Sequence, residues 1–388
     1  MDKELMHLLF ALLRFEIDKI AISELDKKRI TSGVVSNLYV ISKKHDVAHL
    51  IADALERNGI LTNSLPIKKR FLQERSMAIY RYEQQQYEVD RIQDTFEKAK
   101  IPFLLLKGSV MRQYYPEPWM RTSCDIDILV KPEDLECATN VLQEKLYFVK
   151  AEETLHDVSL YAESGVHIEL HYALLPGTQR KKVLNISNRI WNILLPSENN
   201  KYEKHMPDEL FYFYHIAHMV KHFEAGGCGI RPLLDNWILF KEDFWNERTE
   251  SLCKEGGVFK FAQRANELSK IWFEEQSHNQ VTQMMQDFIL SGGMYGGLEN
   301  SVTLKEVQCG GKKRYIFSRI FLPYEILKLQ YPKLEKCKWL TPIYQIRRWF
   351  RIFLGGGASK AVQEIRRSHE RPAVKEDMEI MLKELDLI

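Results

Sequence analysis

A long polar stretch near the N-terminus contains neither glycine nor proline. Residues 71–100, FLQERSMAIYRYEQQQYEVDRIQDTFEKAK, are rich in Gln, Glu, Arg and Lys, which favour helix. The pattern then changes, because PFLLLK at residues 102–107 is a short apolar run that ends at Gly108. Such a run predicts a buried strand followed by a turn. The sequence therefore predicts a helical region over residues 1–98 and a new structural unit after it.

Strand and helix patterns alternate through the next hundred residues. CDIDILV at 124–130 has the two-residue period of a strand, and PEDLECATNVLQEKL opens with proline and acidic residues, as helices do. YFVKAE, DVSLYAE and VHIELHY are three further strand candidates, and Ser-Gly between the last two fits a tight hairpin connection. This order of elements predicts a unit with both sheet and helices over residues 99–200.

The rest of the chain returns to helical patterns. DELFYFYHIAHMVKHFEAGG starts on acidic residues and ends at paired glycines, which predicts the start of a helical domain over residues 201–290. Residues 291–388 begin with a glycine-rich stretch and are expected to form a mostly helical extension. Within it, IYQIRRWFRIFL is basic and aromatic. It predicts a helix that closes the core with a solvated basic face, and a peripheral membrane or nucleic-acid contact is the alternative.

Composition and charge narrow the class of protein. The chain has 388 residues, enough for two or three folded units, and a formal net charge of +2, which creates no global attraction to nucleic acid or anionic membrane. The six cysteines are scattered and never form CxxC, so neither a disulfide framework nor a cysteine zinc site is expected. We identify no signal peptide and no apolar run of about 18 residues that could span a membrane. We therefore expect a soluble, cytoplasmic protein.

A cluster of acidic residues is the first candidate for chemistry. Asp125 and Asp127 are two residues apart on a predicted strand, so both carboxylates project from one face. Two carboxylates this close repel each other, and a bound Mg²⁺ or Mn²⁺ is a common solution. Glu169 lies on one face of VHIELHY and offers a third carboxylate from what could be a neighbouring strand. The alternative is a pair of exposed acids on a half-solvated strand.

A glycine turn precedes the acids. Lys107, Gly108 and Ser109 lie where a predicted strand turns into a helix, a place where backbone N–H groups and a hydroxyl can hold phosphate oxygens. Arg121 lies four residues before Asp125, and we interpret it either as a phosphate clamp or as an ion-pair partner that orients the acids.

Taken together, these motifs resemble a known family. The chain from about Leu104 to Asp235 is similar to the uncharacterised bacterial nucleotidyltransferases sometimes called nucleotidyltransferase family 5. The motifs that carry this similarity are LLKG, YPEPWMR, DIDILV with a following PED helix, VHIELHY and HMVKH. Lys-Gly-Ser, the RTSCDIDILV segment and HIELH also look like the nucleotidyltransferase superfamily of the DNA polymerase β type, of which that family is a member. The resemblance implies an α/β (α+β) fold, with a polymerase β-like mixed sheet flanked by helical N- and C-terminal regions.

The resemblance also implies an activity and roles for residues. The expected reaction is metal-dependent transfer of a nucleoside monophosphate from an NTP, with ATP expected, to a hydroxyl acceptor with release of pyrophosphate. Asp125, Asp127 and Glu169 would bind Mg²⁺ or Mn²⁺, with Glu169 alternatively accepting the acceptor's proton. The nucleotide-binding residues implied by the resemblance are Lys107, Gly108, Ser109, Arg121, Lys221 and His222.

Three alternatives stay open at this point. A small-molecule acceptor is favoured, but spacing similar to abortive-infection toxins makes a tRNA-modifying nucleotidyltransferase the second hypothesis. A degenerate family member that binds nucleotide without catalysis is the third. A zinc hydrolase built on His215, His218 and His222 is the fourth, although the missing HExxH glutamate favours simple helix packing. We also expect an ion pair between Arg231 and Asp235.

Overall fold

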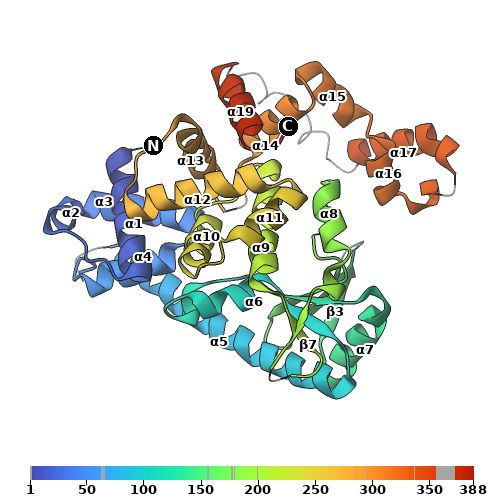
Figure 1. The fold of residues 1–388 in the computed structure, drawn as a ribbon, viewed down its shortest axis with the longest axis horizontal. Coiled ribbons are helices and arrows are strands. Elements are labelled where there is room, and N and C mark those ends of the chain that lie inside the picture. The colour runs from blue at the N-terminus through green and yellow to red at the C-terminus, as the bar shows by residue number, and fades with distance from the viewer. Residues whose placement is uncertain are drawn as a thin grey trace. The chain divides into compact units, whose positions relative to one another are not determined.

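The computed structural model describes residues 2–388 except 63–65, 155–156, 176–177, 179, 199, 295, 336 and 355–371 (Figure 1). It divides into two compact units. The first consists of residues 1–221 and 229–279, and the second of residues 222–228 and 280–388. The division into four domains at residues 98, 200 and 290 stays a prediction.

Five helices form the N-terminal region in the residues that the structure describes. They are α1 (Lys3–Asp18), α2 (Glu24–Arg29), α3 (Ser32–Lys44), α4 (Ala48–Arg57) and α5 (Lys68–Ala99). Side-chain oxygens of Asp2, Ser23 and Thr31 cap the first three helices by accepting backbone N–H groups. The 32-residue helix α5 coincides with the polar stretch without glycine or proline, and it ends at Lys100 in a left-handed conformation.

The described residues that follow form a mixed seven-stranded sheet, which confirms the α/β class. Its strands are β1 (Phe103–Leu105), β2 (Asp125–Val130), β3 (Val149–Glu153), β4 (Asp157–Tyr161), β5 (His167–His171), β6 (Leu195–Pro196) and β7 (Glu203–His205). Their order is β3-β4-β5-β2-β1-β7-β6, with β2 parallel to β5 and β1 parallel to β7. The β4–β5 hairpin turns at Gly165, as predicted from Ser-Gly. The short strands β6 and β7 were not predicted.

One face of the central strands belongs to the hydrophobic core. Ile126 and Ile128 of β2 and Ile168 of β5 are fully buried with apolar residues of α5 and of α7 (Leu135–Leu146). In Figure 1, α5 and α7 lie on the same side of the sheet. Because successive strand residues point to opposite faces, this packing directs the acidic residues between the isoleucines to the other face.

The short helix α6 (Lys107–Met111) follows β1. The other α-helices described in the first unit are α8 (Lys181–Ser187), α9 (Asp208–Ala225), α10 (Arg231–Lys241), α11 (Glu247–Gly256) and α12 (Phe259–Glu274). The last turn of α9 belongs to the second unit. Aromatic stacking joins this group to the N-terminal helices, since the rings of Phe10 and Trp272 lie 4.5 Å apart. Trp237 also donates a hydrogen bond to Asp18 at 3.0 Å. Helices α9 to α12 therefore pack as one group with the N-terminal helices, and the helical domain proposed for residues 201–290, which also contains strand β7, stays a prediction.

The second unit contains α13 (Gln280–Gly292), α14 (Leu298–Gln308), α15 (Lys312–Ile320), α16 (Tyr324–Gln330), α17 (Thr341–Leu354) and α19 (Pro372–Glu384). No helix among the residues that the structure describes is both long and apolar enough to cross a membrane.

A buried carboxyl group generates a prediction about stability. Glu16 on α1 is fully buried, and among the described residues neither of its carboxyl oxygens has a hydrogen-bond partner. Burial and the nearby charge of Asp53 raise the pKa of Glu16 from 4.5 to about 7. Between these pH values the folded protein retains a proton that the unfolded chain releases. The contribution of this group to stability therefore falls as the pH rises from 4.5 to 7.

We expect Glu16→Gln to raise the free energy of unfolding by about 1 to 3 kcal/mol at pH 8, because the amide carries no charge to bury. At pH 4.5 the variant and the wild type should be nearly equal in stability. Urea denaturation at both pH values measures this difference. The exposed substitution Glu136→Gln on α7 serves as the control and should show no such pH-dependent gain. A Glu16→Gln gain of the same size at both pH values would contradict the account.

Candidate active site

Three carboxylates meet on the polar face of the sheet. In the parallel pairing of β2 with β5, Asp125 lies opposite His167 and Asp127 lies opposite Glu169. Their alternation with buried isoleucines places all four side chains on the face opposite the core. The prediction that the strand of Glu169 neighbours the strand of the aspartates is confirmed.

Two cationic side chains lie against Asp127, which is only 6% exposed. The ring N–H at Nε2 of His171 donates to Asp127 Oδ1 at 2.7 Å and lies 3.3 Å from Glu169 Oε2. Lys107 Nζ lies 3.5 Å from Asp127 Oδ2. Burial alone would raise the pKa of Asp127, but Lys107 and His171 hold that pKa well below its usual range. Burial alone would lower the pKa of His171, but its bonds to the two carboxylates raise it to about 9.

Asp125 experiences the opposite balance. Burial, followed by the negative charges of Asp127 and Glu169, raises the pKa of Asp125 to about 6. Near neutral pH the ionised form of Asp125 is therefore destabilised by its surroundings. An additional cation beside it would stabilise that form. The site has more negative charge than Lys107 and His171 offset.

The donor atoms fit a hard divalent cation. Ligand atoms of Asp125, His167 and Glu169 lie within 4.8 Å of one another, and so do those of Asp127, Glu169 and His171. Carboxylate oxygens are the ligands that Mg²⁺ and Mn²⁺ prefer. Glu169 belongs to both groups, so it is the residue that links them.

The glycine turn packs directly against the strand of the aspartates. The backbone N–H of Leu106 donates to the carbonyl of Asp127 at 3.0 Å, and Lys107 has a positive φ of 36°, uncommon for a lysine. A Cβ atom at Gly108 would lie 2.9 Å from the Cβ of Ser123, so a larger residue does not fit without movement. The turn and Asp127 are therefore held at a fixed distance.

A buried polar network supports this turn and was not predicted from the sequence. The Arg112 guanidinium donates to the side-chain oxygen of Gln85 at 2.8 Å, to Ser123 Oγ at 3.1 Å and to the carbonyl of Gly108 at 3.2 Å. Gln85 in turn donates to the carbonyl of Ser123 at 3.1 Å. Gln85 lies in the middle of α5, and its polarity in the sequence does not distinguish it from the surrounding glutamines.

Arg121 forms a buried ion pair with Asp235 of α10. Arg121 Nε and Nη2 donate to the two carboxylate oxygens at 2.8 and 2.9 Å, and Tyr115 donates to the same carboxylate at 2.7 Å. The predicted pairing of Asp235 with Arg231 is wrong. Arg231 instead contacts Asp46 and donates to the carbonyl of Thr122 at 3.1 Å. The deeper position of Arg121 gives it the bidentate geometry that a buried carboxylate requires.

The sequence of this chain matches a known protein family. A family model described as "uncharacterised nucleotidyltransferase" matches residues 34–274, more than half of the chain and all of the site described above. The chain belongs to this nucleotidyltransferase family. No curated protein and no solved structure gives a significant match. The resemblance stated from the motifs is thus confirmed, and membership implies a nucleotide substrate.

Two residues of helix α9 interact electrostatically with the acidic cluster of β2 and β5. The hydroxyl of Tyr214 is buried and has no hydrogen-bond partner in the part of the chain that the structure describes. Burial, then the charges of Asp127 and Asp125, raise the pKa of Tyr214 well above its usual value. Burial, and then the charge of Lys107, lower the pKa of Lys221, while the charges of Asp127 and Glu169 oppose this shift. Neither the sequence pattern nor a motif had indicated Tyr214.

The histidines of α9 do not form a metal group with one another in the described residues. His215 Nε2 lies 3.1 Å from the carbonyl of Pro232, and burial lowers the pKa of this imidazole. These observations favour the packing interpretation over the zinc hydrolase. His222 belongs to the second compact unit, so its position beside the nucleotide stays a prediction.

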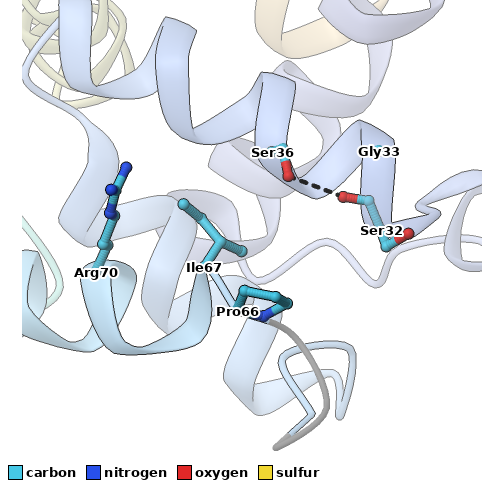
Figure 2. A pocket seen from close by; sticks show the side chains of 6 residues that line it. All are labelled: Ser32, Gly33, Ser36, Pro66, Ile67 and Arg70. Atoms are coloured by element: carbon cyan, nitrogen blue, oxygen red, sulfur yellow. Dashed lines mark hydrogen bonds between the residues drawn. The ribbon is translucent and has the colours of Figure 1, made fainter.

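A separate pocket lies among the N-terminal helices of the nucleotidyltransferase. It has a volume of about 500 Å³ and lies between the start of α3 and the start of α5, as Figure 2 shows. Its lining residues are Ser32, Gly33, Ser36, Pro66, Ile67 and Arg70. None of them belongs to the acidic site.

The buried Arg121–Asp235 pair contributes to stability only while both charges are present. Asp235→Ala leaves a buried guanidinium without its carboxylate, so we expect a loss of about 3 to 5 kcal/mol in the free energy of unfolding. The double variant Arg121→Met/Asp235→Leu removes both charges and should lose less stability than the single variant. Chemical denaturation of both proteins measures the difference. A double variant less stable than Asp235→Ala would show that the charge pair is not the source of the loss.

Proposed function

We propose that the protein transfers a nucleoside monophosphate from an NTP to an acceptor hydroxyl and releases pyrophosphate. The convergence of Asp125, Asp127 and Glu169 beside Lys107 supports this proposal most strongly. In the reaction, the acceptor oxygen forms a bond to the α-phosphorus while the bond to the bridging oxygen of the β-phosphate breaks. This chemistry needs alignment and neutralisation of charge more than a side-chain nucleophile.

Asp125, Asp127 and Glu169 would hold Mg²⁺ or Mn²⁺. When bound, the ion would neutralise phosphate charge and relieve the repulsion that, together with burial as the larger cause, raises the pKa of Asp125 to about 6. His171 acts as a positioning residue in this scheme, because it contacts both Asp127 and Glu169 and holds their carboxylates together. Glu169 could alternatively accept the proton of the acceptor hydroxyl.

Lys107, Gly108 and Ser109 would contact the triphosphate, for which ATP is the expected donor. Lys107 is partly exposed beside Asp127, and its positive φ is the kind of backbone strain that concentrates at functional sites. The buried Ser109 hydroxyl has no hydrogen-bond partner among the described residues, so it could donate to an incoming oxygen. Lys221 of α9 would bring positive charge to a phosphate of the nucleotide. His222, the next residue, would contact a phosphate as well.

Arg121 would act on the nucleotide indirectly. Asp235 occupies its guanidinium, so we assign it to positioning the loop that precedes Asp125. Arg121 would therefore serve as an ion-pair partner and not as a phosphate clamp. The acceptor is proposed to be a small molecule with a free hydroxyl.

Isothermal titration calorimetry tests the metal and nucleotide assignments. We expect the wild type to bind ATP more tightly with Mg²⁺ than with EDTA, and Asp127→Asn to lose most of that difference, at least about tenfold in affinity. Glu144→Gln, an exposed substitution on α7, is the control and should bind as the wild type does. Equal Mg²⁺-dependent affinity in the wild type and Asp127→Asn would remove Asp127 from the metal site.

Pyrophosphate release tests the reaction itself. With a panel of hydroxyl acceptors and all four NTPs, the wild type should release pyrophosphate, and Asp125→Asn and Glu169→Gln should each reduce the rate at least about a hundredfold. A retained rate in both variants would contradict the proposed roles. Nucleotide binding without pyrophosphate release for any acceptor, tRNA included, would favour a protein that binds nucleotide without transferring it.

A further inference from the structure

Positive charge concentrates in one part of the second unit. Residues 312–354 contain eleven lysines and arginines against two glutamates, a net charge of +9. Since the whole chain has a net charge of +2, the other residues together have −7. The balanced total therefore conceals a strongly basic segment, which consists of α15, α16, α17 and their connections.

The same segment exposes large apolar side chains on α17. Ile343, Ile346 and Phe350 are three and four residues apart, so they form one stripe along the helix. They are 57%, 47% and 64% exposed, and Trp339 just before the helix is 75% exposed. An apolar stripe of this kind normally faces a core, and in the structure of this unit it faces solvent.

Helix α15 extends this apolar surface. Trp349 Nε1 donates to the carbonyl of Ile320 at 2.8 Å, and its ring lies 5.3 Å from that of Phe321. Phe317 and Phe321 are 64% and 43% exposed and lie 4.9 Å apart. Because Trp349 and Ile346 are neighbours on the helix surface, the exposed aromatic residues of α15 continue the stripe of α17.

Exposed basic side chains accompany the apolar surface. Arg347 lies beside Ile346 and Ile343 on α17, Lys338 adjoins Trp339, and Lys313, Arg314 and Arg319 are exposed on α15. A helix with large apolar residues on one face and basic residues beside them is the form that binds at the interface of an anionic bilayer. Aromatic rings alone could also stack on nucleic-acid bases, but the exposed isoleucines offer no such interaction.

We propose that α15 and α17 form a peripheral membrane-binding surface for bilayers rich in anionic lipid. Ile343, Ile346, Phe350 and Trp339 enter the boundary between headgroups and acyl chains. The surrounding lysines and arginines attract the lipid phosphates. Binding of this kind lies along the surface of the bilayer and does not require a helix that spans it. It is independent of the nucleotide chemistry proposed above.

Vesicle flotation with the full-length protein tests the proposal. The probes are vesicles of phosphatidylcholine alone and vesicles with about 30% phosphatidylglycerol. We expect binding to the anionic vesicles, weaker binding at about 0.5 M NaCl, where charges are screened over a few ångströms, and little binding to the neutral vesicles. The α17 variant carries the substitutions Ile343→Ser, Ile346→Ser and Phe350→Ser. It should bind the anionic vesicles at least about tenfold more weakly, because it lacks the apolar side chains while its charge is unchanged.

The matched control is Leu25→Ser/Val40→Ser/Ile79→Ser, which removes three exposed apolar side chains from the N-terminal helices and should bind as the wild type does. Circular dichroism and thermal melting verify that both triple variants fold. Absence of wild-type binding, or equal binding by the α17 variant, would overturn the proposal. Tight binding of a single-stranded RNA oligonucleotide, with no binding to vesicles, would also overturn the proposal. The same holds if light scattering shows that the wild type is a dimer, that the α17 variant is a monomer, and that the wild type does not bind vesicles.

Discussion

The parallel pairing of β2 with β5 is the constraint on which the acidic site depends. It places Asp127 directly beside Glu169, and the buried isoleucines on the other face prevent either strand from shifting its register by one residue. Like charges at this spacing destabilise the folded state unless cations accompany them. Lys107 and His171 supply part of that compensation from within the chain. Burial, and after it the negative charges of Asp127 and Glu169, still raise the pKa of Asp125.

The segments around strands β2 and β5 are joined by contacts that do not involve the three carboxylates. Gly108 contacts Ser123 so closely that a methyl group would not fit, and Arg112 and Gln85 join the two segments through hydrogen bonds. The bond from Arg121 to Asp235 ties the loop before β2 to helix α10. A site of this construction is preorganised, which is what transfer of a phosphoryl group between two bound partners requires.

The two units differ in what they present to solvent. In the first unit, buried aromatic rings such as Phe10 and Trp272 join the N-terminal helices to α12, and strands β2 and β5 bring three carboxylates together. The second unit exposes aromatic and aliphatic side chains among many basic residues. If the proposed membrane contact holds, nucleotide chemistry and attachment to a surface reside in separate parts of one chain. Their separation would let one property be removed without the other.

Local patterns in the sequence determined most of the elements of this nucleotidyltransferase. The long α5, the alternating strand β2 and the hairpin at Gly165 follow from helix propensity, two-residue periodicity and turn chemistry, which act over a few neighbouring residues. The motifs also identified the family, and they singled out three acids that the pairing of β2 with β5 brings together. The strands β6 and β7 were missed, because two or three residues carry no readable period and pair only once β1 offers an edge.

Only the tertiary structure decided which charged groups meet. Nothing local distinguishes Arg121 from Arg231 as the partner of Asp235, and the choice follows from which side chain is buried beside α10. The contact of His171 with Asp127 and the approach of Tyr214 to the acids likewise join residues more than forty positions apart. Ion pairs and pKa values depend on distance and burial, and these are properties of the packed chain and not of its sequence pattern.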